Sequence, residues 1–159
     1  MQKFNELQLA KELIRFPTIK TEDKGIMKFL SKKLSAIGFN CRIIKSKGTG
    51  LKPALNLYAR LGRKKPHVSY LGHTDVVANL ENWSVPPFKG KIKNGEIISR
   101  GIADMKGSIA CWISATNNFI KNKKFNGSIS IIIAADEETT GLGTPAVMKY
   151  LKRKREKID

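Results

Sequence analysis

The stretch Ser128–Ala134 is the feature of this sequence that most limits its possible folds. It reads Ser-Ile-Ser-Ile-Ile-Ile-Ala, without the regular polar alternation of a strand that has one solvated face. A continuous apolar run of this length is typical of a strand that is buried on both faces. The rest of the chain must therefore supply layers for both sides of a sheet.

The segments around this strand supply such layers. Apolar residues at helical spacing predict helices at 4–16, 24–37 and 105–121, and Pro145 is placed to begin a last helix that runs to Asp159. Strands are predicted at 41–45 and 54–61, a buried strand at 68–71, and a hairpin with an Asn-Gly turn at 91–98. Strands that alternate with helices predict an α/β fold, with a mixed, largely parallel sheet and helices on both faces.

Length and composition set the class of protein. The 159 residues correspond to one domain or to part of a larger one. No apolar run reaches the roughly 18 residues that a membrane helix needs, and the first residues lack a secretory signal, so we expect a cytoplasmic protein without a membrane partner. Cys41 and Cys111 are far apart and outside any Cys-x-x-Cys pattern, so we expect buried free thiols rather than a disulfide or a cysteine-rich zinc site.

The chain is strongly basic. Thirty Lys and Arg residues stand against 13 Asp and Glu, which gives a formal net charge of +17. Such a charge attracts polyanions, so nucleic-acid binding has to be considered. The basic residues are scattered apart from one dense run at 149–157, and no nucleic-acid motif accompanies them. We interpret the charge as a solvated lysine-rich surface, with a non-catalytic nucleic-acid-binding fragment as a distant alternative.

Residues of the kinds that bind metals follow three separate stretches. His73 and Asp75 come after the strand at 68–71, Asp104 lies in a loop before a helix, and Asp136, Glu137 and Glu138 follow Ser128–Ala134. In open α/β sheets the working site lies at the carboxyl ends of the strands, so these residues are expected to converge. Three successive acids in a chain poor in acids are unfavourable without a cation. This combination predicts a metal site.

The residue types indicate which chemistry the site performs. A histidine nitrogen with carboxylate oxygens suits zinc or a related divalent metal. Asp75 lies two residues after His73, on the same side of an extended chain, and can hold the second imidazole nitrogen. Of the two adjacent glutamates, one can bind metal while the other stays free as a general base. Asp104 is a carboxylate able to bridge two metals about 3.5–4 Å apart.

Four motifs carry a resemblance to a known family. They are Gly72-His-Thr-Asp-Val-Val77, Trp83-Ser-Val-Pro-Pro-Phe88, Arg100-Gly-Ile-Ala-Asp-Met-Lys-Gly-Ser108 and Ala135-Asp-Glu-Glu138. In this order, they resemble the amino-terminal part of the dinuclear zinc metallopeptidases of the aminoacylase and deacylase family. The tracts at 15–19 and 103–110 favour the succinyl-diaminopimelate desuccinylase branch. Acetylornithine deacetylases and related amidohydrolases share the first and third motifs.

The resemblance implies a role for each site residue. His73 would bind one zinc with Asp75 orienting it, Asp104 would bridge both zincs, Glu137 would be the general base and Glu138 would bind the second zinc. Cobalt is a possible substitute for zinc. The implied reaction is hydrolysis of N-succinyl-L,L-2,6-diaminopimelate to succinate and L,L-diaminopimelate, in lysine and cell-wall precursor synthesis. A related N-acyl amino acid deacylase, such as an acetylornithine deacetylase, is the alternative.

The resemblance also implies parts that these residues do not contain. Family members have two further ligands, an acid on a later strand and a histidine near the end of a longer chain, together with a smaller dimerisation domain. We therefore expect residues 1–159 to be the amino-terminal portion of the catalytic domain, weakly active or inactive alone. The homodimer of the complete enzymes is not expected to form through this portion. The other histidine, His67, lies within a strand and is interpreted as structural.

Overall fold

The computed structural model describes residues 5–48, 53–78 and 81–159. Its elements follow in the order α1 (Glu6–Ile14), α2 (Ile26–Ser35), β1 (Asn40–Ser46), β2 (Ala54–Gly62), β3 (His67–His73), β4 (Lys91–Lys93), β5 (Glu96–Ile98), the π-helical turn η1 (Ile102–Lys106), α3 (Gly107–Asn122), β6 (Ser128–Ala134) and α4 (Gly143–Arg153). Phe4, the predicted start of the first helix, lies outside the described residues. Within these ranges no helix combines the length and the apolar character needed to cross a membrane.

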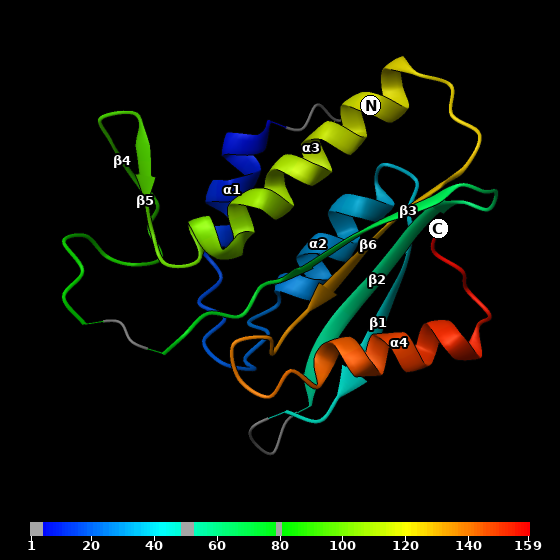
Figure 1. The fold of residues 1–159 in the computed structure, drawn as a ribbon. Helices are drawn as coiled ribbons and strands as arrows, with labels where there is room; N and C mark the ends of the chain where they lie inside the picture. Colours follow the sequence, from blue (N-terminus) through cyan, green and yellow to red (C-terminus); the bar gives the residue numbers. More distant parts are fainter. Residues whose placement is uncertain (1–4, 49–52, 79–80) are drawn as a thin grey trace.

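One four-stranded sheet, in the order β1-β2-β6-β3, forms the centre of the fold (Figure 1). Strand β2 pairs antiparallel with β1 and with β6, and β3 pairs parallel with β6. The predicted α/β class with a mixed sheet is confirmed. This part of the sheet is less parallel than predicted. The short connection between β1 and β2 makes them an antiparallel hairpin, and β2 also pairs antiparallel with β6.

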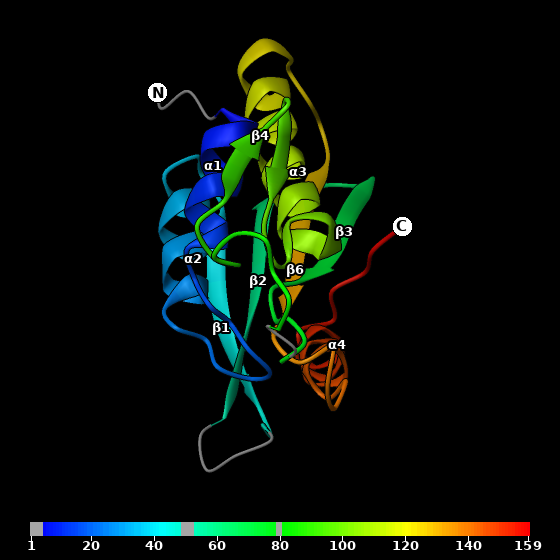
Figure 2. The same cartoon turned by 90° about the vertical axis from the view of Figure 1, so that its left-hand side faces the viewer.

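Helices cover both faces of the sheet. Helices α1, α2 and α3 lie on one side and α4 lies on the other (Figure 2). In β6, Ile131 and Ile133 belong to the larger core under α1–α3, whereas Ile132 packs with Val147 and Leu151 of α4. All residues of β6 except Ile129 are buried, so the prediction of a strand buried on both faces is confirmed.

Strand β3 differs from its prediction as a buried strand. Val68 is 60% exposed and Leu71 is 51% exposed. The reason is its position: within the described residues β3 pairs with β6 alone and forms an edge of the sheet. The two cysteines are free thiols as predicted, but Cys111 is exposed and Cys41 is only partly buried.

The last helix is shorter than predicted. Helix α4 ends at Arg153, and Arg155 has a φ of 54° in the left-handed region. The amide of Glu156 then donates to the carbonyl of Leu151 over 3.0 Å, a bond that closes a helix behind a left-handed residue. The basic run therefore leaves the helix, and the amide of Asp159 donates to the carbonyl of His67 at the start of β3.

The hairpin and the start of the second helix follow their local sequence signals. Strands β4 and β5 pair across Asn94 and Gly95, both of which have positive φ. The predicted capping residue Asp23 accepts hydrogen bonds from the amides of Gly25 and Met27 at the start of α2. These signals act within a few residues, which is why the sequence predicts them well.

The two-sided burial of β6 makes a test of the core. We expect Ile131→Ala to lower the free energy of unfolding by about 2–5 kcal/mol, because Ile131 is fully buried under the helices. Val68→Ala on the neighbouring strand is the control and should change it by about 0.5 kcal/mol or less. Urea unfolding followed by circular dichroism measures both. Equal effects of the two substitutions would contradict the assigned layers.

Candidate metal centre

Strands β3 and β6 bring two parts of the predicted site together. Their parallel register pairs His73 with Ala134, and the amide of Thr74 donates to the carbonyl of Ala134 over 3.2 Å. Since parallel strands end at the same edge of a sheet, His73 at the end of β3 lies beside the segment 135–138 that follows β6. Its side chain is buried, with 6% of the residue exposed.

The third part comes from the turn before α3. Gly101, with a φ of 76°, immediately precedes η1, and the backbone at Asp104 is not helical. The peptide bond between Asp104 and Met105 is cis. The Asp104 side chain is 73% exposed, and its Oδ1 lies 3.0 Å from Nε2 of His73. This turn therefore presents a carboxylate to the imidazole from a segment far away in sequence.

The three predicted metal ligands form one cluster. His73, Asp104 and Glu138 each offer one ligand atom, and these atoms all lie within 4.8 Å of one another. One imidazole nitrogen and two carboxylate oxygens form a donor set that suits zinc. The fold thus brings the predicted residues together, while their binding of a metal stays a prediction.

Asp75 lies behind this cluster and is 1% exposed. Its Oδ1 accepts a hydrogen bond from the amide of Glu137 over 3.2 Å, and its Oδ2 accepts one from the amide of Glu138 over 2.9 Å. Oδ1 also lies 3.5 Å from Nδ1 of His73, whose other near neighbour is the Asp75 carbonyl oxygen at 3.3 Å. Because both neighbours of Nδ1 are acceptors, Nδ1 carries a proton. Nε2 faces Oδ1 of Asp104 at 3.0 Å and is the nitrogen at which a metal could replace the proton of the imidazolium.

The charges around His73 shift its titration. Burial lowers the pKa of His73, but the hydrogen bonds and negative charges of Asp75 and Asp104 outweigh burial and raise it to about 9. Burial, and after it the negative charge of Asp104, raises the pKa of Glu138. In the cluster, the positive charge of the His73 imidazolium partly balances the negative charges of the carboxylates. A bound cation would be stabilised there for the same reason.

Glu137 lies on the solvent-exposed side of the cluster. Its side chain is 59% exposed, and its Oε2 lies 3.8 Å from Nε2 of His73. Glu138 contributes the ligand atom of the cluster and Glu137 does not. The two adjacent glutamates thus occupy different positions beside His73, and the separate roles expected for them stay predictions.

Asp136 does not face the cluster, although the sequence groups it with the two glutamates. It is fully buried, and its carboxylate accepts hydrogen bonds from the amide of Gly143 at 2.7 Å, the amide of Leu142 at 3.1 Å and the hydroxyl of Thr140. These groups lie at the amino end of α4, where a negative charge is stabilised. Only two of the three successive acids therefore contribute to the predicted metal charge.

Lys106 is a buried cation to which sequence reasoning assigned no role. It is fully buried, and its Nζ donates to the carbonyl oxygen of Phe16 over 2.8 Å. Burial lowers the pKa of Lys106 to about 8, against the opposing effect of the negative charge of Asp75. No spacing rule predicts this contact, because Lys106 and Phe16 are distant in sequence and meet only in the folded chain.

The segment around Thr18 supports the end of β3. The hydroxyl of Thr18 donates to the carbonyl of Thr74, and the amide of Val76 donates to the carbonyl of Thr18 over 3.0 Å. These two contacts hold the backbone on both sides of Asp75, at Thr74 and Val76.

His67 is structural, as interpreted from the sequence. It lies at the opposite end of β3, about 20 Å from His73 at a strand rise of about 3.3 Å per residue. Its Nδ1 lies 2.7 Å from the carbonyl oxygen of Lys157, and its Nε2 lies 2.8 Å from the hydroxyl of Ser130. Both ring nitrogens are thus used within the fold.

The separation between Asp136 and Glu138 can be tested by stability. We expect Asp136→Asn to lower the free energy of unfolding of the metal-free chain by about 1–3 kcal/mol, because a buried amide cannot replace the carboxylate toward all its donors. Glu138→Gln, the matched change two residues away, should alter it by about 0.5 kcal/mol or less, since the raised pKa shows that the fold disfavours the charge of Glu138. Thermal and urea unfolding would reveal a wrong assignment if Glu138→Gln proved the more damaging change.

Comparison with known proteins gives several matches over this chain. Residues 70–159 match the model of Peptidase family M20/M25/M40. The succinyl-diaminopimelate desuccinylase of Pelagibacter ubique (strain HTCC1062) is 52% identical over 163 residues, which cover 100% of this chain and 42% of that protein. The desuccinylase of Ehrlichia canis (strain Jake) is 41% identical over 157 residues, which cover 96% of this chain and 41% of the relative. The chain thus spans about two fifths of the length of these relatives.

Solved structures share the fold. The M20 family metallo-carboxypeptidase Sso-CP2 from Sulfolobus solfataricus matches with a TM-score of 0.80 at 21% identity, over 100% of this chain and 36% of that one. Human carnosine dipeptidase 1 matches with a TM-score of 0.78 at 21% identity, over 94% of this chain and 35% of its own. The family model covers more than half of the sequence, and the motifs that surround His73, Asp104 and Glu138 fall within it. The chain therefore belongs to the M20/M25/M40 peptidase family.

Proposed function

We propose that this chain supplies part of the active site of a zinc-dependent amide hydrolase. The observation that carries the proposal is the cluster of His73, Asp104 and Glu138, whose ligand atoms lie within 4.8 Å of one another in front of the buried Asp75. Zinc held there would act as a Lewis acid, polarising an amide carbonyl and lowering the pKa of an attacking water toward about 7. A divalent metal is also what the family of this chain implies.

The residues of the cluster fit such an ion. His73 presents Nε2, because Nδ1 is engaged by Asp75, and a carboxylate behind a ligating histidine is the usual means of orienting it. Asp104 is exposed and has two oxygens, so we assign it as the bridge between two metals, with Glu138 as a ligand of the second. Burial, and after it the negative charge of Asp104, raises the pKa of Glu138, and the positive charge of a bound metal would lower that pKa again.

Glu137 is the proposed general base. Its amide is held by Asp75, while its carboxylate is exposed beside the cluster. The carboxylate would accept a proton from the attacking water and later deliver it to the nitrogen of the leaving amine. This division of labour gives the adjacent glutamates different tasks: Glu138 binds metal and Glu137 moves a proton.

The substrate that we propose is N-succinyl-L,L-2,6-diaminopimelate, cleaved to succinate and L,L-diaminopimelate. Support comes from the curated relatives, several of which are named succinyl-diaminopimelate desuccinylase; those from Pelagibacter ubique and Ehrlichia canis are 52% and 41% identical to this chain. We further propose a cytoplasmic location, two zinc ions in the complete site with cobalt as a possible substitute, and a homodimer formed through regions outside residues 1–159.

Zinc binding by the 159-residue chain tests the metal cluster. We expect the chain to compete with a chromogenic chelator for zinc. Glu138→Gln should weaken the binding of zinc by the chain, because a ligand is lost. Asp75→Asn should weaken it about 10–100-fold, because the ligating imidazole loses its orienting partner. Glu96→Gln, an exposed acid in β5, is the control and should leave the affinity unchanged. Equal affinities for all four proteins would refute the assignment of the cluster.

Activity is best tested in a chimera of residues 1–159 with the remaining part of the Pelagibacter ubique desuccinylase. We expect Glu137→Gln to lower kcat about 10²–10⁴-fold while zinc affinity is kept, because only the proton-transfer group is removed. Glu96→Gln again serves as the control. A chimera that binds zinc but keeps its kcat after Glu137→Gln would exclude Glu137 as the base.

The same chimera tests the substrate. We expect a higher kcat/KM for N-succinyl-L,L-2,6-diaminopimelate than for N-acetylornithine. The reverse order would retain amide hydrolysis but replace the proposed substrate by that of a related N-acyl amino acid deacylase.

A further inference from the structure

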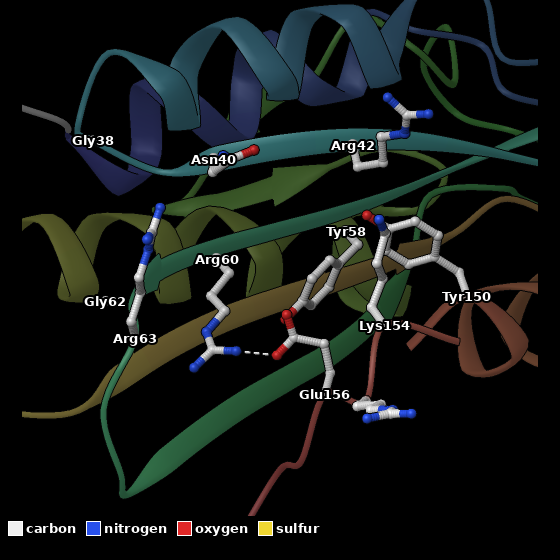
Figure 3. A pocket seen from close by; sticks show the side chains of 11 residues that line it. Gly38, Asn40, Arg42, Tyr58, Arg60, Gly62, Arg63, Tyr150, Lys154 and Glu156 are labelled. Atoms are coloured by element: carbon white, nitrogen blue, oxygen red, sulfur yellow. Dashed lines mark hydrogen bonds and ion pairs between the residues drawn. The ribbon is translucent and has the colours of Figure 1, made fainter. Parts of the chain in front are cut away.

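A pocket lies apart from the metal cluster. It has a volume of about 700 Å³, is partly open to solvent, and is lined by β1, β2, the end of α4 and the residues that follow it (Figure 3). It includes Gly62 and Arg63, at the end of β2 where the sheet register places Ser128 and His67 rather than His73. The pocket therefore lies toward the opposite ends of the strands from the metal cluster.

Most of the charged side chains that line this pocket are basic. They are Arg42, Arg60, Arg63, Lys154 and Arg155, against the single acid Glu156. The strand register places Arg42 opposite Tyr58 and Asn40 opposite Arg60, so these side chains emerge on the sheet face that α4 covers. The left-handed backbone at Arg155 turns the chain back over this face.

Only one of the five cations has a partner in the described part of the chain. Arg60 forms an ion pair with Glu156 and donates to the hydroxyl of Ser128 over 2.8 Å. The side chains of Arg42, Arg63, Lys154 and Arg155 make no hydrogen bond or ion pair with a described residue. Like charges that line one pocket repel one another, so a bound anion would be stabilised there.

Buried polar groups point to the same conclusion. Tyr58 is 5% exposed, and neither its hydroxyl nor the Nε of Arg60 has a well-aligned hydrogen bond within the described residues, although Ser130 and Arg60 lie near that hydroxyl. Burial and the negative charge of Glu156 raise the pKa of Tyr58, which keeps its hydroxyl protonated. The floor of the pocket thus holds hydrogen-bond donors whose capacity the protein itself does not use.

We propose that this pocket binds a small anion that carries two or more negative charges on phosphate groups. Guanidinium groups suit phosphate oxygens because they donate two parallel hydrogen bonds in a fixed fork. The pocket volume lies within the range of small-molecule sites, about 300–1,000 Å³. The basic side chains line one partly open pocket. The rings of Tyr58 and Tyr150 pack on each other at 6.2 Å, so neither offers a free platform for nucleic-acid bases. The site is independent of the proposed hydrolase.

The test is calorimetric titration of the 159-residue chain with inorganic pyrophosphate at low salt. We expect saturable binding that weakens as salt is added, because salt screens the charges. The double variant Arg42→Glu/Arg63→Glu should weaken binding about tenfold or more for each charge-assisted bond lost. The control is Lys28→Glu/Lys32→Glu on the exposed side of α2, which changes the net charge equally and should leave affinity within about twofold.

Two further variants separate binding from folding. Arg42→Gln/Arg63→Gln removes the two charges without reversing them and should still weaken binding. Tyr58→Phe removes one donor from the floor and should weaken it about two- to tenfold, while circular dichroism stays unchanged.

Three outcomes would overturn the proposal. Pyrophosphate does not bind saturably at low salt; both charge-reversal variants lose affinity equally; or a single-stranded RNA oligonucleotide binds through the pocket arginines and pyrophosphate does not displace it. The last result would identify a nucleic-acid surface instead of a small-anion site.

Discussion

The carboxylate of Asp75 is the group on which the metal cluster depends. It is almost completely buried and accepts hydrogen bonds from the amides of Glu137 and Glu138 while it faces Nδ1 of His73. A buried carboxylate destabilises the folded state unless it is paired, so the loss of any of these contacts would be unfavourable. One side chain thus fixes the end of β3, the segment after β6 and the imidazole tautomer at the same time.

The cluster is packed against the fold on the side of Asp75 and is exposed to solvent on the other side. Behind it, Lys106 is fully buried and bonded to the carbonyl of Phe16, and Thr18 holds the backbone of Thr74 and Val76. In front, Asp104 and Glu137 are largely exposed. Ligands held from behind and accessible from outside are what a site needs if substrate is to approach a preorganised metal. The basic pocket lies toward the other end of the strands of the same sheet. The positive charge of this chain is therefore partly concentrated around one pocket and is not spread evenly over a solvated surface.

Features encoded within a few residues could be predicted from the sequence, and features made by distant contacts could not. The Asn94-Gly95 turn and the Asp23 cap are local, and the structure has both. Asp136 shows the limit: in sequence it is one of three successive acids, but its carboxylate binds the amides of Leu142 and Gly143 at α4. Alternating directions along an extended segment separate neighbours that the sequence groups together, and nothing local says which of them faces the site.

Apolar periodicity and motif spacing are properties of the amino-acid chain alone, so they suffice to predict the class of fold, the residue types of the cluster and the family resemblance. The folded chain adds that β3 lies at an edge of the sheet within the described residues, with Val68 and Leu71 exposed. It also adds that Lys106 is buried behind Asp75 and that the arginines of β1 and β2 line one pocket with the residues after α4. Each of these depends on which segments become neighbours. That choice follows from burying apolar surface across the whole sheet, and no short stretch of sequence contains it.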